Sequence, residues 1–323
     1  MNGLRSAIAT SVLTRSDVLA ARDAIAGRLH RTPTLTSASL EREVGVPVYL
    51  KAELFQRTGS FKPRGVLNKL ASLSDDEKAR GVIGISAGNH AQALAYGAGR
   101  EAIDALIVMW QGVSEQKLEA TRAYGAAVDL ASTDPGGAFE RLHELMEESG
   151  RTLVHPFDDP LVIAGQGTVG LELAEDAPDV DVIVVPVGGG GLVSGIRVAS
   201  EGRIVAVEPE GSAALHEALK TGEPVAVTPE SIADGLNAPF AGANAVAICK
   251  DQVESVLVAE QEIEAGLRFL YTRAKLACEP AAAAGVGALL AGKVPLQGAK
   301  AVGLVVSGGN VAPETAAAIL APR

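Results

Sequence analysis

One lysine stands in a setting that could make its amine reactive. Lys62 lies in the segment Thr58-Gly-Ser-Phe-Lys-Pro-Arg-Gly65, after a polar turn and before a helical pattern over Val66 to Ser72. A lysine amine is a nucleophile only when it is deprotonated, and a dry cleft or a nearby positive charge favours that state. A solvated surface lysine is the competing interpretation, since most lysines in proteins are exposed. The segment therefore predicts a nucleophile only if other parts of the chain supply a binding site.

A run of four glycines could bind a phosphate group. The apolar segment Val182 to Val187 is predicted to be a buried strand, and it leads directly into Gly188 to Gly191 and then into a helix. Backbone N–H groups in such a loop can face an anion, and the absence of side chains lets the anion approach closely. A tightly packed turn is one alternative. A dinucleotide site is another, because Glu208 ends the next strand, but the third glycine of that fingerprint is missing. A single phosphate fits the spacing better.

Two further polar turns also follow predicted strands. Ser86-Ala-Gly-Asn-His90 opens a helical pattern, where free N–H groups, a serine hydroxyl and an amide could bind a carboxylate. A serine that only caps the helix is an equally good interpretation. Ser307-Gly-Gly-Asn310 again places a hydroxyl and glycines after a strand. Because open α/β sheets bind ligands at the carboxyl ends of their strands, the turns are predicted to share one site.

The pattern of elements predicts how these segments are held. Short β-branched runs alternate with longer helical patterns, which indicates an α/β fold with mainly parallel strands. Strands are predicted over residues 48–50, 82–86, 105–109, 182–187, 204–207, 254–258 and 302–307. Ser16 and Asp17 are predicted to cap a helix over Val18 to Leu29. Gly125 is predicted to end a helix over Glu115 to Tyr124.

Composition and charge exclude several classes of protein. The chain has 323 residues, a net charge of −11 and scattered lysines and arginines, which argues against a nucleic-acid partner. No segment has the run of about 20 apolar residues that a membrane helix needs, and Met1 to Leu13 lack the pattern of a signal peptide. We therefore expect a cytoplasmic protein that does not bind a membrane. Cys249 and Cys278 are predicted to be reduced, buried thiols.

Together the segments resemble the threonine dehydratase and serine racemase family, whose members are fold type II enzymes that use pyridoxal 5'-phosphate. The resemblance depends on Ser60-Phe-Lys-Pro-Arg-Gly65, Ser86-Ala-Gly-Asn-His90, Gly188 to Gly191 and Ser307-Gly-Gly-Asn310. Other matching stretches are His30 to Pro33, His155 to Pro160, Gly165 to Thr168, Ile232 to Gly235 and Glu279-Pro280. The similarity covers nearly the whole chain. It implies a tryptophan synthase β-like fold with two open, mainly parallel sheets, one in a large cofactor-binding lobe (1–73 and 151–323) and one in a small lobe (74–150) that binds the substrate carboxylate.

The resemblance also implies a role for each motif. Lys62 would bind the cofactor aldehyde covalently, and Phe61 would lie near the ring. Asn89 would contact the 3-hydroxyl of the ring and Ser307 its pyridine nitrogen. The cofactor phosphate would bind Gly188, Gly189, Gly190, Gly191 and Leu192, and the substrate carboxylate would bind Ser86, Gly88, Asn89 and His90. Because the hydroxyl of Ser307 is neutral, it would not keep a proton on the ring, and loss of a β-substituent is favoured over a long-lived carbanion.

The implied reaction is dehydration and deamination of a β-hydroxy amino acid, L-threonine or L-serine, to a 2-oxo acid and ammonia. The freed amine of Lys62 would remove the α-proton, and the β-hydroxyl would leave with a proton supplied nearby. Ala87 occupies the position of a second serine that related racemases place before Gly-Asn-His, so proton transfer on one side only is expected. Ala214 stands where some relatives have a carboxylate that binds a metal together with Glu208, so we expect no metal.

Other functions remain open at this point. The runner-up is a serine racemase or a hydroxyaspartate dehydratase-like enzyme, followed by a β-replacement enzyme of the cysteine synthase type. A non-catalytic binding protein on an enzyme fold is a third possibility, because a fold does not guarantee a function. The resemblance implies a homodimer or homotetramer, and the sequence does not identify the preferred hydroxy amino acid.

Overall fold

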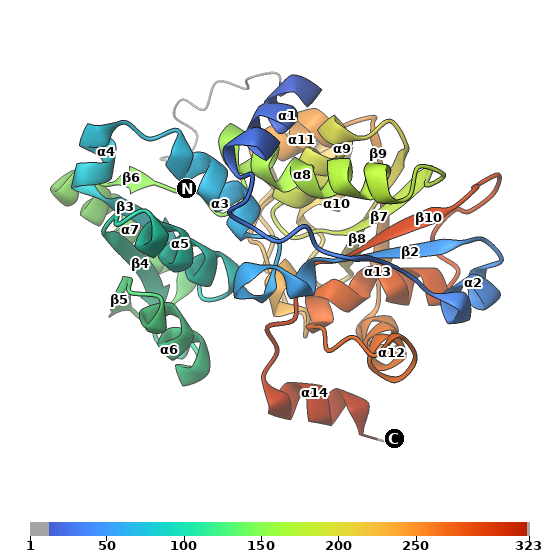
Figure 1. Ribbon diagram of the computed structural model, residues 1–323. Coiled ribbons are helices and arrows are strands. Elements are labelled where there is room, and N and C mark those ends of the chain that lie inside the picture. The colour runs from blue at the N-terminus through green and yellow to red at the C-terminus, as the bar shows by residue number, and fades with distance from the viewer. Residues whose placement is uncertain (1–12, 322–323) are drawn as a thin grey trace.

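The computed structural model describes residues 13–321, whose strands form two separate sheets (Figure 1). The strands are β1 (Thr34–Thr36), β2 (Val48–Ala52), β3 (Val82–Ile85), β4 (Ala105–Trp110), β5 (Ala127–Ser132), β6 (Thr152–Leu153), β7 (Val182–Pro186), β8 (Arg203–Pro209), β9 (Val253–Val258) and β10 (Val302–Val306). The larger sheet has the order β1-β2-β10-β7-β8-β9 and the smaller one the order β5-β4-β3-β6. Neighbouring strands are parallel except for β1 and β2. The predicted α/β fold with two mainly parallel sheets is confirmed.

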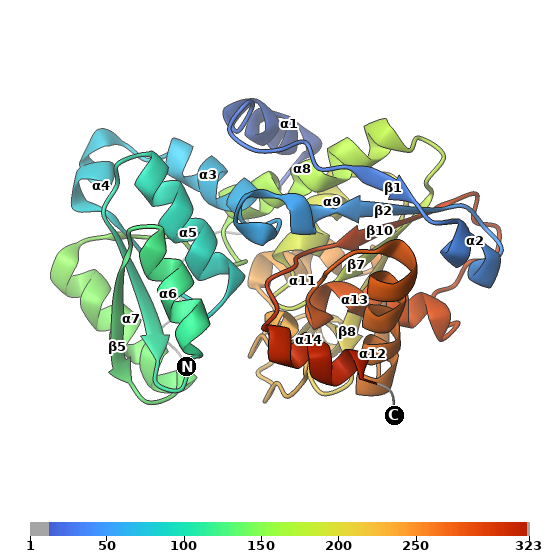
Figure 2. The same cartoon turned by 60° about the horizontal axis from the view of Figure 1, so that its bottom comes forward.

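Helices pack around both sheets. They are α1 (Arg15–Ala24), α2 (Ala38–Val44), α3 (Pro63–Ala71), α4 (Asp75–Arg80), α5 (Asn89–Arg100), α6 (Glu115–Ala123), α7 (Pro135–Ser149), α8 (Pro160–Asp176), α9 (Gly191–Ala199), α10 (Ala214–Thr221), α11 (Ala243–Cys249), α12 (Glu260–Phe269), α13 (Pro280–Leu290) and α14 (Pro313–Leu320). Short helical turns are η2 (Glu53–Phe55), η3 (Arg57–Gly59), η4 (Asp234–Leu236) and the π-helical η5 (Leu270–Ala274). Figure 2 shows α5, α6 and α7 around the smaller sheet, and α12, α13 and α14 together beside the larger one.

Strand β7 explains why the central strands are apolar throughout. Val182 and Val184 pack into a core that contains α13, whereas Ile183 and Val185 pack into a second core with residues of α8 and α9. A strand that is buried on both faces needs apolar side chains at every position. The glycine loop begins at the carboxyl end of this strand.

All seven predicted strands are present, and three further strands were not predicted. These three are β1, β5 and β6, which have three, six and two residues. Each lies at the edge of its sheet. Most of their residues are partly or fully exposed, so they lack the continuous apolar pattern that marks the central strands.

The predicted start of the first helix was wrong. Thr14 is the N-cap of α1, because its backbone N–H and its hydroxyl both donate to the Asp17 carboxylate, at 2.8 and 2.7 Å. The helix ends at Ala24 rather than Leu29, and the chain then turns at Gly27, where φ is +70°. The predicted stop at Gly125 is confirmed, since α6 ends at Ala123 and Gly125 has a φ of +95°.

Three other expectations concern the chain as a whole. Both cysteines are buried and unpaired, as predicted. Within residues 13–321, no helix combines the length and the apolar character needed to cross a bilayer. The expectation about a signal peptide concerns Met1 to Leu13, of which residues 1–12 lie outside the described part of the chain.

Candidate active site

Hydrogen bonds join three of the four sequence motifs directly, and the fourth follows an adjacent strand. The segment before Lys62 pairs with the end of β10: Ser60 forms a β-bridge with Gly308, and the Phe61 N–H donates to the Ser307 carbonyl at 3.1 Å. Asn89, the first residue of α5, contacts Asn310 at 2.8 Å. The glycine loop follows β7, a neighbour of β10 in the larger sheet. The structure thus places three motifs in contact and the glycine loop at the carboxyl end of a neighbouring strand.

The Lys62 side chain is partly buried, and its amine contacts a backbone carbonyl. Its Nζ donates to the Pro156 carbonyl at 2.7 Å and lies 5.2 Å from the centre of the Phe61 ring. Burial lowers the pKa of the Lys62 amine from 10.5 to about 8, and the negative charge of Glu279 partly opposes this effect. At pH 7 a lysine with such a pKa is about one-tenth deprotonated, far more than an ordinary lysine, and the deprotonated form is the state that a nucleophile or a base needs.

The pH dependence of cofactor capture should follow this pKa. We expect the rate at which the apoprotein binds pyridoxal phosphate covalently to rise with pH, with a midpoint near 8, because the deprotonated amine is the attacking form. Stopped-flow absorbance measured from about pH 6 to pH 10 would give the midpoint. The Glu279→Gln variant should have a lower midpoint, since it removes the charge that favours the protonated amine. A midpoint near 10.5 in the unmodified protein would contradict this assignment.

A buried ion-pair network fixes the start of α3, two residues after Lys62. The Arg64 guanidinium, whose side chain is 1% exposed, donates to Glu53 through Nε and Nη2, both at 2.8 Å. It also donates to Glu172 of α8 at 2.7 and 2.9 Å and to Thr168 at 3.1 Å. Lys51, which is fully buried, pairs with Glu172 at 2.7 Å. The network thus joins the larger sheet, α3 and α8 next to the Lys62 segment.

Each glycine of the loop lies against a neighbour that would crowd or overlap a side chain. A Cβ atom at Gly188 would lie 3.2 Å from the Cα atom of Leu236, and one at Gly189 would lie 2.3 Å from the ring of Phe157. Gly190 has a φ of +92°, and a Cβ atom at Gly191 would lie 2.8 Å from the Phe157 carbonyl. The N–H groups of Gly191 and Leu192 are the first of α9 and have no acceptor within the helix. This loop fits a phosphate group.

An alanine at position 189 should weaken cofactor binding. Its Cβ would overlap the Phe157 ring, so the loop must shift, at a cost of about 1–3 kcal/mol, or roughly tenfold to a hundredfold in the dissociation constant. An absorbance titration of the apoprotein with pyridoxal phosphate measures this constant. The double variant Gly189→Ala with Phe157→Ala removes the overlap and should regain most of the affinity. A Gly189→Ala variant with unchanged affinity would contradict the proposed packing.

The Ser86 to His90 turn provides backbone donors rather than a catalytic histidine. Gly88 is the N-cap of α5, and Ser86 accepts a hydrogen bond from its N–H through Oγ at 3.1 Å, so the serine does not cap the helix itself. The His90 ring is 2% exposed and contacts the Val154 carbonyl through Nε2 at 2.8 Å. Burial lowers the pKa of His90 to about 3, so the ring is neutral. Only the backbone N–H of His90 is therefore placed at the helix start.

Sequence reasoning did not assign a role to two other parts of this site. The turn from His155 to Asp159 supplies the Pro156 carbonyl to Lys62 and the Phe157 ring to the glycine loop. Its Asp158 carboxylate accepts from the N–H groups of Ala243 and Asn244, at 2.9 and 3.0 Å, at the start of α11. The second part is Glu279, which contacts Asn89. Both stretches match the family, but nothing in the local pattern reveals their contacts.

Glu279 is a buried carboxyl group that contacts Asn89. Its Oε1 accepts from Asn89 Nδ2 at 2.8 Å, and the residue is 4% exposed. Burial raises the pKa of Glu279 to about 8, with a further contribution from the negative charge of Asp234. The site therefore holds an amine and a carboxyl group that both titrate near pH 8.

Glu208 uses both of its carboxylate oxygens within the protein. They accept hydrogen bonds from the N–H groups of Leu215 and His216 in α10, each at 2.7 Å. Burial raises the pKa of Glu208 to about 8. Across residues 13–321, no group of three or more histidine, cysteine, aspartate or glutamate side chains is arranged to hold a metal ion.

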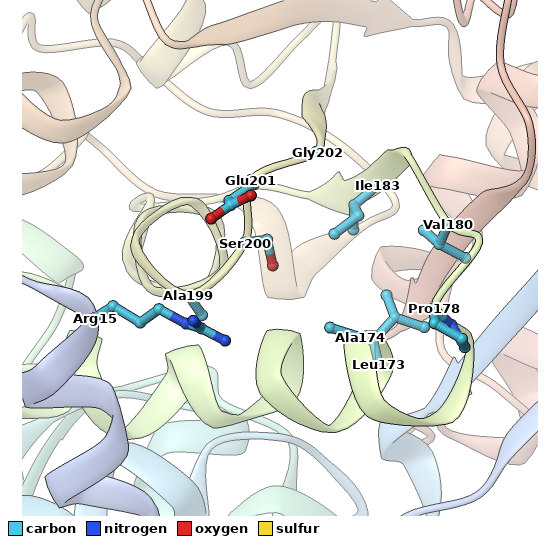
Figure 3. Close-up of a pocket in the computed structure, with 10 residues that line it drawn as sticks. All are labelled: Arg15, Leu173, Ala174, Pro178, Val180, Ile183, Ala199, Ser200, Glu201 and Gly202. Carbon is cyan, nitrogen blue, oxygen red and sulfur yellow. The ribbon is translucent and has the colours of Figure 1, made fainter.

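A cavity of about 370 Å³ lies elsewhere in the molecule (Figure 3). Its lining includes Leu173 near the end of α8, Ala199 at the end of α9, and Gly202 just before β8. These positions are at the amino ends of β7 and β8, whereas the glycine loop follows the carboxyl end of β7. The cavity is therefore separate from the candidate active site.

Comparisons with known proteins agree with this geometry. The family model described as "Pyridoxal-phosphate dependent enzyme" matches residues 25–308. The chain is 42% identical to an L-threonine ammonia-lyase of Thermotoga maritima, over 93% of this chain and 76% of that protein. It is 39% identical to an L-threo-3-hydroxyaspartate ammonia-lyase of Saccharomyces cerevisiae, over 93% and 94% of the two chains. Among solved structures, maize serine racemase aligns with a TM-score of 0.91 and 33% identity, over 94% and 96% of the chains. The chain belongs to the family of pyridoxal-phosphate dependent enzymes.

Proposed function

We propose that this protein removes water and ammonia from a β-hydroxy amino acid, L-threonine or L-serine, and releases a 2-oxo acid. The observation that carries the proposal is a partly buried amine of lowered pKa, Lys62, which contacts Pro156, while the next residue, Phe157, packs against the glycine loop. The 42% identity to an L-threonine ammonia-lyase supports the same reaction.

Several residues would hold the cofactor and the substrate. Gly188, Gly189, Gly190, Gly191 and Leu192 would bind the cofactor phosphate, with Phe61, Asn89 and Ser307 around the ring. Ser86, Gly88, Asn89 and His90 would bind the substrate carboxylate at the start of α5, where unpaired N–H groups and the helix dipole favour an anion. When bound, the cofactor supplies an aldehyde that condenses with amines and a ring that withdraws electrons from the α-carbon.

Lys62 would act first as the covalent anchor of the cofactor and then as the base. Once the substrate amine has displaced it, the Lys62 amine would take the α-proton, as its lowered pKa allows. The hydroxyl of Ser307 is neutral and would leave the ring nitrogen without a strong partner for a proton. This favours loss of the β-hydroxyl over a persistent negative charge at the α-carbon.

Ala87 favours a lyase over a racemase. A racemase must deliver a proton to the face of the substrate opposite Lys62, and the methyl group of Ala87 cannot carry one. The likeness to maize serine racemase makes racemisation the second candidate function. The hydroxyaspartate ammonia-lyase relative makes an acidic hydroxy amino acid a further candidate substrate.

A substrate panel tests the proposal. The holoenzyme should release 2-oxo acid from L-threonine or L-serine, faster than from L-threo-3-hydroxyaspartate, and should form little D-serine. A coupled dehydrogenase assay measures the 2-oxo acid, and chiral chromatography measures D-serine. O-acetylserine with sulfide serves as the control for β-replacement. If no β-hydroxy amino acid yields a 2-oxo acid, the proposed function is wrong.

The lobe boundaries, the assembly and the location belong to the same proposal. Residues 74–150 would form the small lobe, and residues 1–73 and 151–323 the large lobe. A homodimer or homotetramer in the cytoplasm remains the prediction. Size-exclusion chromatography with light scattering would measure the number of subunits.

A further inference from the structure

Asn310 joins three of the sequence motifs through one amide group. Its Nδ2 donates to the Thr58 carbonyl at 2.7 Å and to Asn89 Oδ1 at 2.8 Å. Thr58 belongs to the turn before Lys62, and Asn89 opens α5 beside the smaller sheet. Asn310 itself follows β10 of the larger sheet. The contacts therefore link the lysine segment, the α5 turn and the end of β10.

The Thr58 carbonyl determines which way both amides point. A backbone carbonyl can only accept a hydrogen bond, so the Asn310 atom that faces it must be the NH₂ group. The same NH₂ group faces Asn89, and the Asn89 atom beside it must therefore be the oxygen. The NH₂ group of Asn89 is then directed to Glu279, whose Oε1 accepts at 2.8 Å. The orientation of the Asn89 amide therefore follows from the Thr58 carbonyl, which can only accept a hydrogen bond.

Two glycines lie directly against this chain of side chains. A Cβ atom at Gly59 would lie 2.5 Å from the Asn310 side chain, and Gly59 has a φ of +72°. A Cβ atom at Gly308 would lie 2.5 Å from Glu279 Oε1 and 3.3 Å from Asn89 Nδ2. The Thr58 residue has a positive φ of 59°, which is uncommon without glycine, and its carbonyl is held by Asn310. The two glycines thus make room for the chain of amides.

The charged groups around Glu279 do not change the direction of the hydrogen bond from Asn89 to Glu279. Glu279 faces Asp234, Lys117 and Lys62, and Asp234 forms an ion pair with Lys117. Asp234 disfavours the charged state of Glu279, and Lys117 and Lys62 favour it. In either protonation state a Glu279 oxygen can accept from Asn89, because a protonated carboxyl group keeps acceptor capacity.

We propose that Asn310 is a positioning residue that fixes Asn89 as a hydrogen-bond donor toward the cofactor. Asn89 Nδ2 has two hydrogens, and the bond to Glu279 uses one of them. The second remains for an acceptor in the site, and the group of matching chemistry is the 3-oxygen of the cofactor ring. A reversed Asn89 would present its carbonyl oxygen to that oxygen and repel it. The inference rests on the proposed function, which places the ring beside Asn89.

The test compares two cofactors in two proteins. Asn310→Asp has the same shape but replaces the NH₂ group by an oxygen, which opposes the Thr58 carbonyl and competes with Glu279 for the Asn89 NH₂ group. Dissociation constants are measured by absorbance and fluorescence titration with pyridoxal phosphate and with 3-deoxypyridoxal phosphate, which lacks the 3-oxygen. We expect Asn310→Asp to bind pyridoxal phosphate at least about tenfold more weakly, as for a lost hydrogen bond to a charged group. Its affinity for the 3-deoxy cofactor should equal that of the unmodified protein.

Glu279→Gln is a matched carboxyl-to-amide exchange, and its amide oxygen can still accept from Asn89, so its preference for pyridoxal phosphate over the 3-deoxy cofactor should be retained. Equal weakening of both cofactors by Asn310→Asp would mean a purely structural role, and unchanged binding of both would mean no role. Either result would overturn the proposal. If Asn310→Asp does not fold, Asn310→Ala is measured against the same two cofactors, with the same criterion.

The proposed function can fail separately. If the unmodified protein binds pyridoxal phosphate at Lys62 but releases no 2-oxo acid, the reaction is wrong while the cofactor comparison stands. If the reaction proceeds and Asn310→Asp changes the affinity for both cofactors equally, only the role of Asn310 is wrong.

Discussion

Replacing Lys62 by alanine is expected to lower the rate of 2-oxo acid release from L-threonine by about 10³-fold or more. In the proposed function this residue is both the covalent anchor of the cofactor and the base that takes the α-proton, and a positioned base alone contributes about 10²–10⁴-fold. Burial lowers the pKa of this amine to about 8. An exposed lysine of ordinary pKa is far less deprotonated at neutral pH and cannot take over its role. Steady-state kinetics with saturating pyridoxal phosphate, together with the absorbance spectrum, measure the loss.

A second lysine of the same region supplies the control. Lys69 lies on α3, and its amine pairs with Asp159 at 2.9 Å, away from the Pro156 carbonyl that Lys62 contacts. Lys69→Ala should retain the activity within about threefold, since neither Lys69 nor Asp159 is among the residues proposed to bind cofactor or substrate. A Lys62→Ala variant with activity similar to that of Lys69→Ala would exclude Lys62 as the reactive group.

Replacing Arg64 by methionine is expected to destabilise the protein by about 3–5 kcal/mol. The guanidinium is buried and donates to Glu53, Glu172 and Thr168, so its removal leaves Glu53, which is fully buried, without a cation bound to it directly. Urea unfolding followed by circular dichroism would measure the free energy of unfolding. The cofactor affinity should fall as well, because α3 begins directly after Lys62.

The matched control is an arginine at the exposed side of the same network. Arg31 pairs with Glu175 and Asp176 at 2.8 and 2.6 Å, but its side chain is 52% exposed. Arg31→Met should change the free energy of unfolding by about 1 kcal/mol or less, because water screens and replaces the lost contacts. Equal effects of the two substitutions would show that burial does not govern this network.

The central elements and the main motifs were predictable because their signals are local. β7 is apolar at every position and is followed by four glycines, a pattern that only a buried strand and a side-chain-free loop explain. The edge strands β1 and β6 have three and two residues, too few for any periodicity. Their place in the sheets is decided by pairing with neighbours rather than by their own sequence.

The partners of the motif residues were not predictable, because they come from distant parts of the chain. Pro156, whose carbonyl contacts the Lys62 amine, is 94 residues away in sequence, and Glu279 is 190 residues away from Asn89. The partner of the His90 ring, the Val154 carbonyl, is likewise 64 residues away in sequence. A sequence pattern reports the type of a residue and its spacing, but it does not report which backbone carbonyl a side chain reaches.

Borohydride reduction of the cofactor-saturated protein tests the central claim most directly. Reduction converts a covalent link between an amine and pyridoxal phosphate into a stable bond, and peptide mapping by mass spectrometry then identifies the modified residue. We predict a single pyridoxyl group on the peptide that contains Lys62. A modification at another lysine, or an unmodified Lys62 in fully loaded protein, would contradict the account.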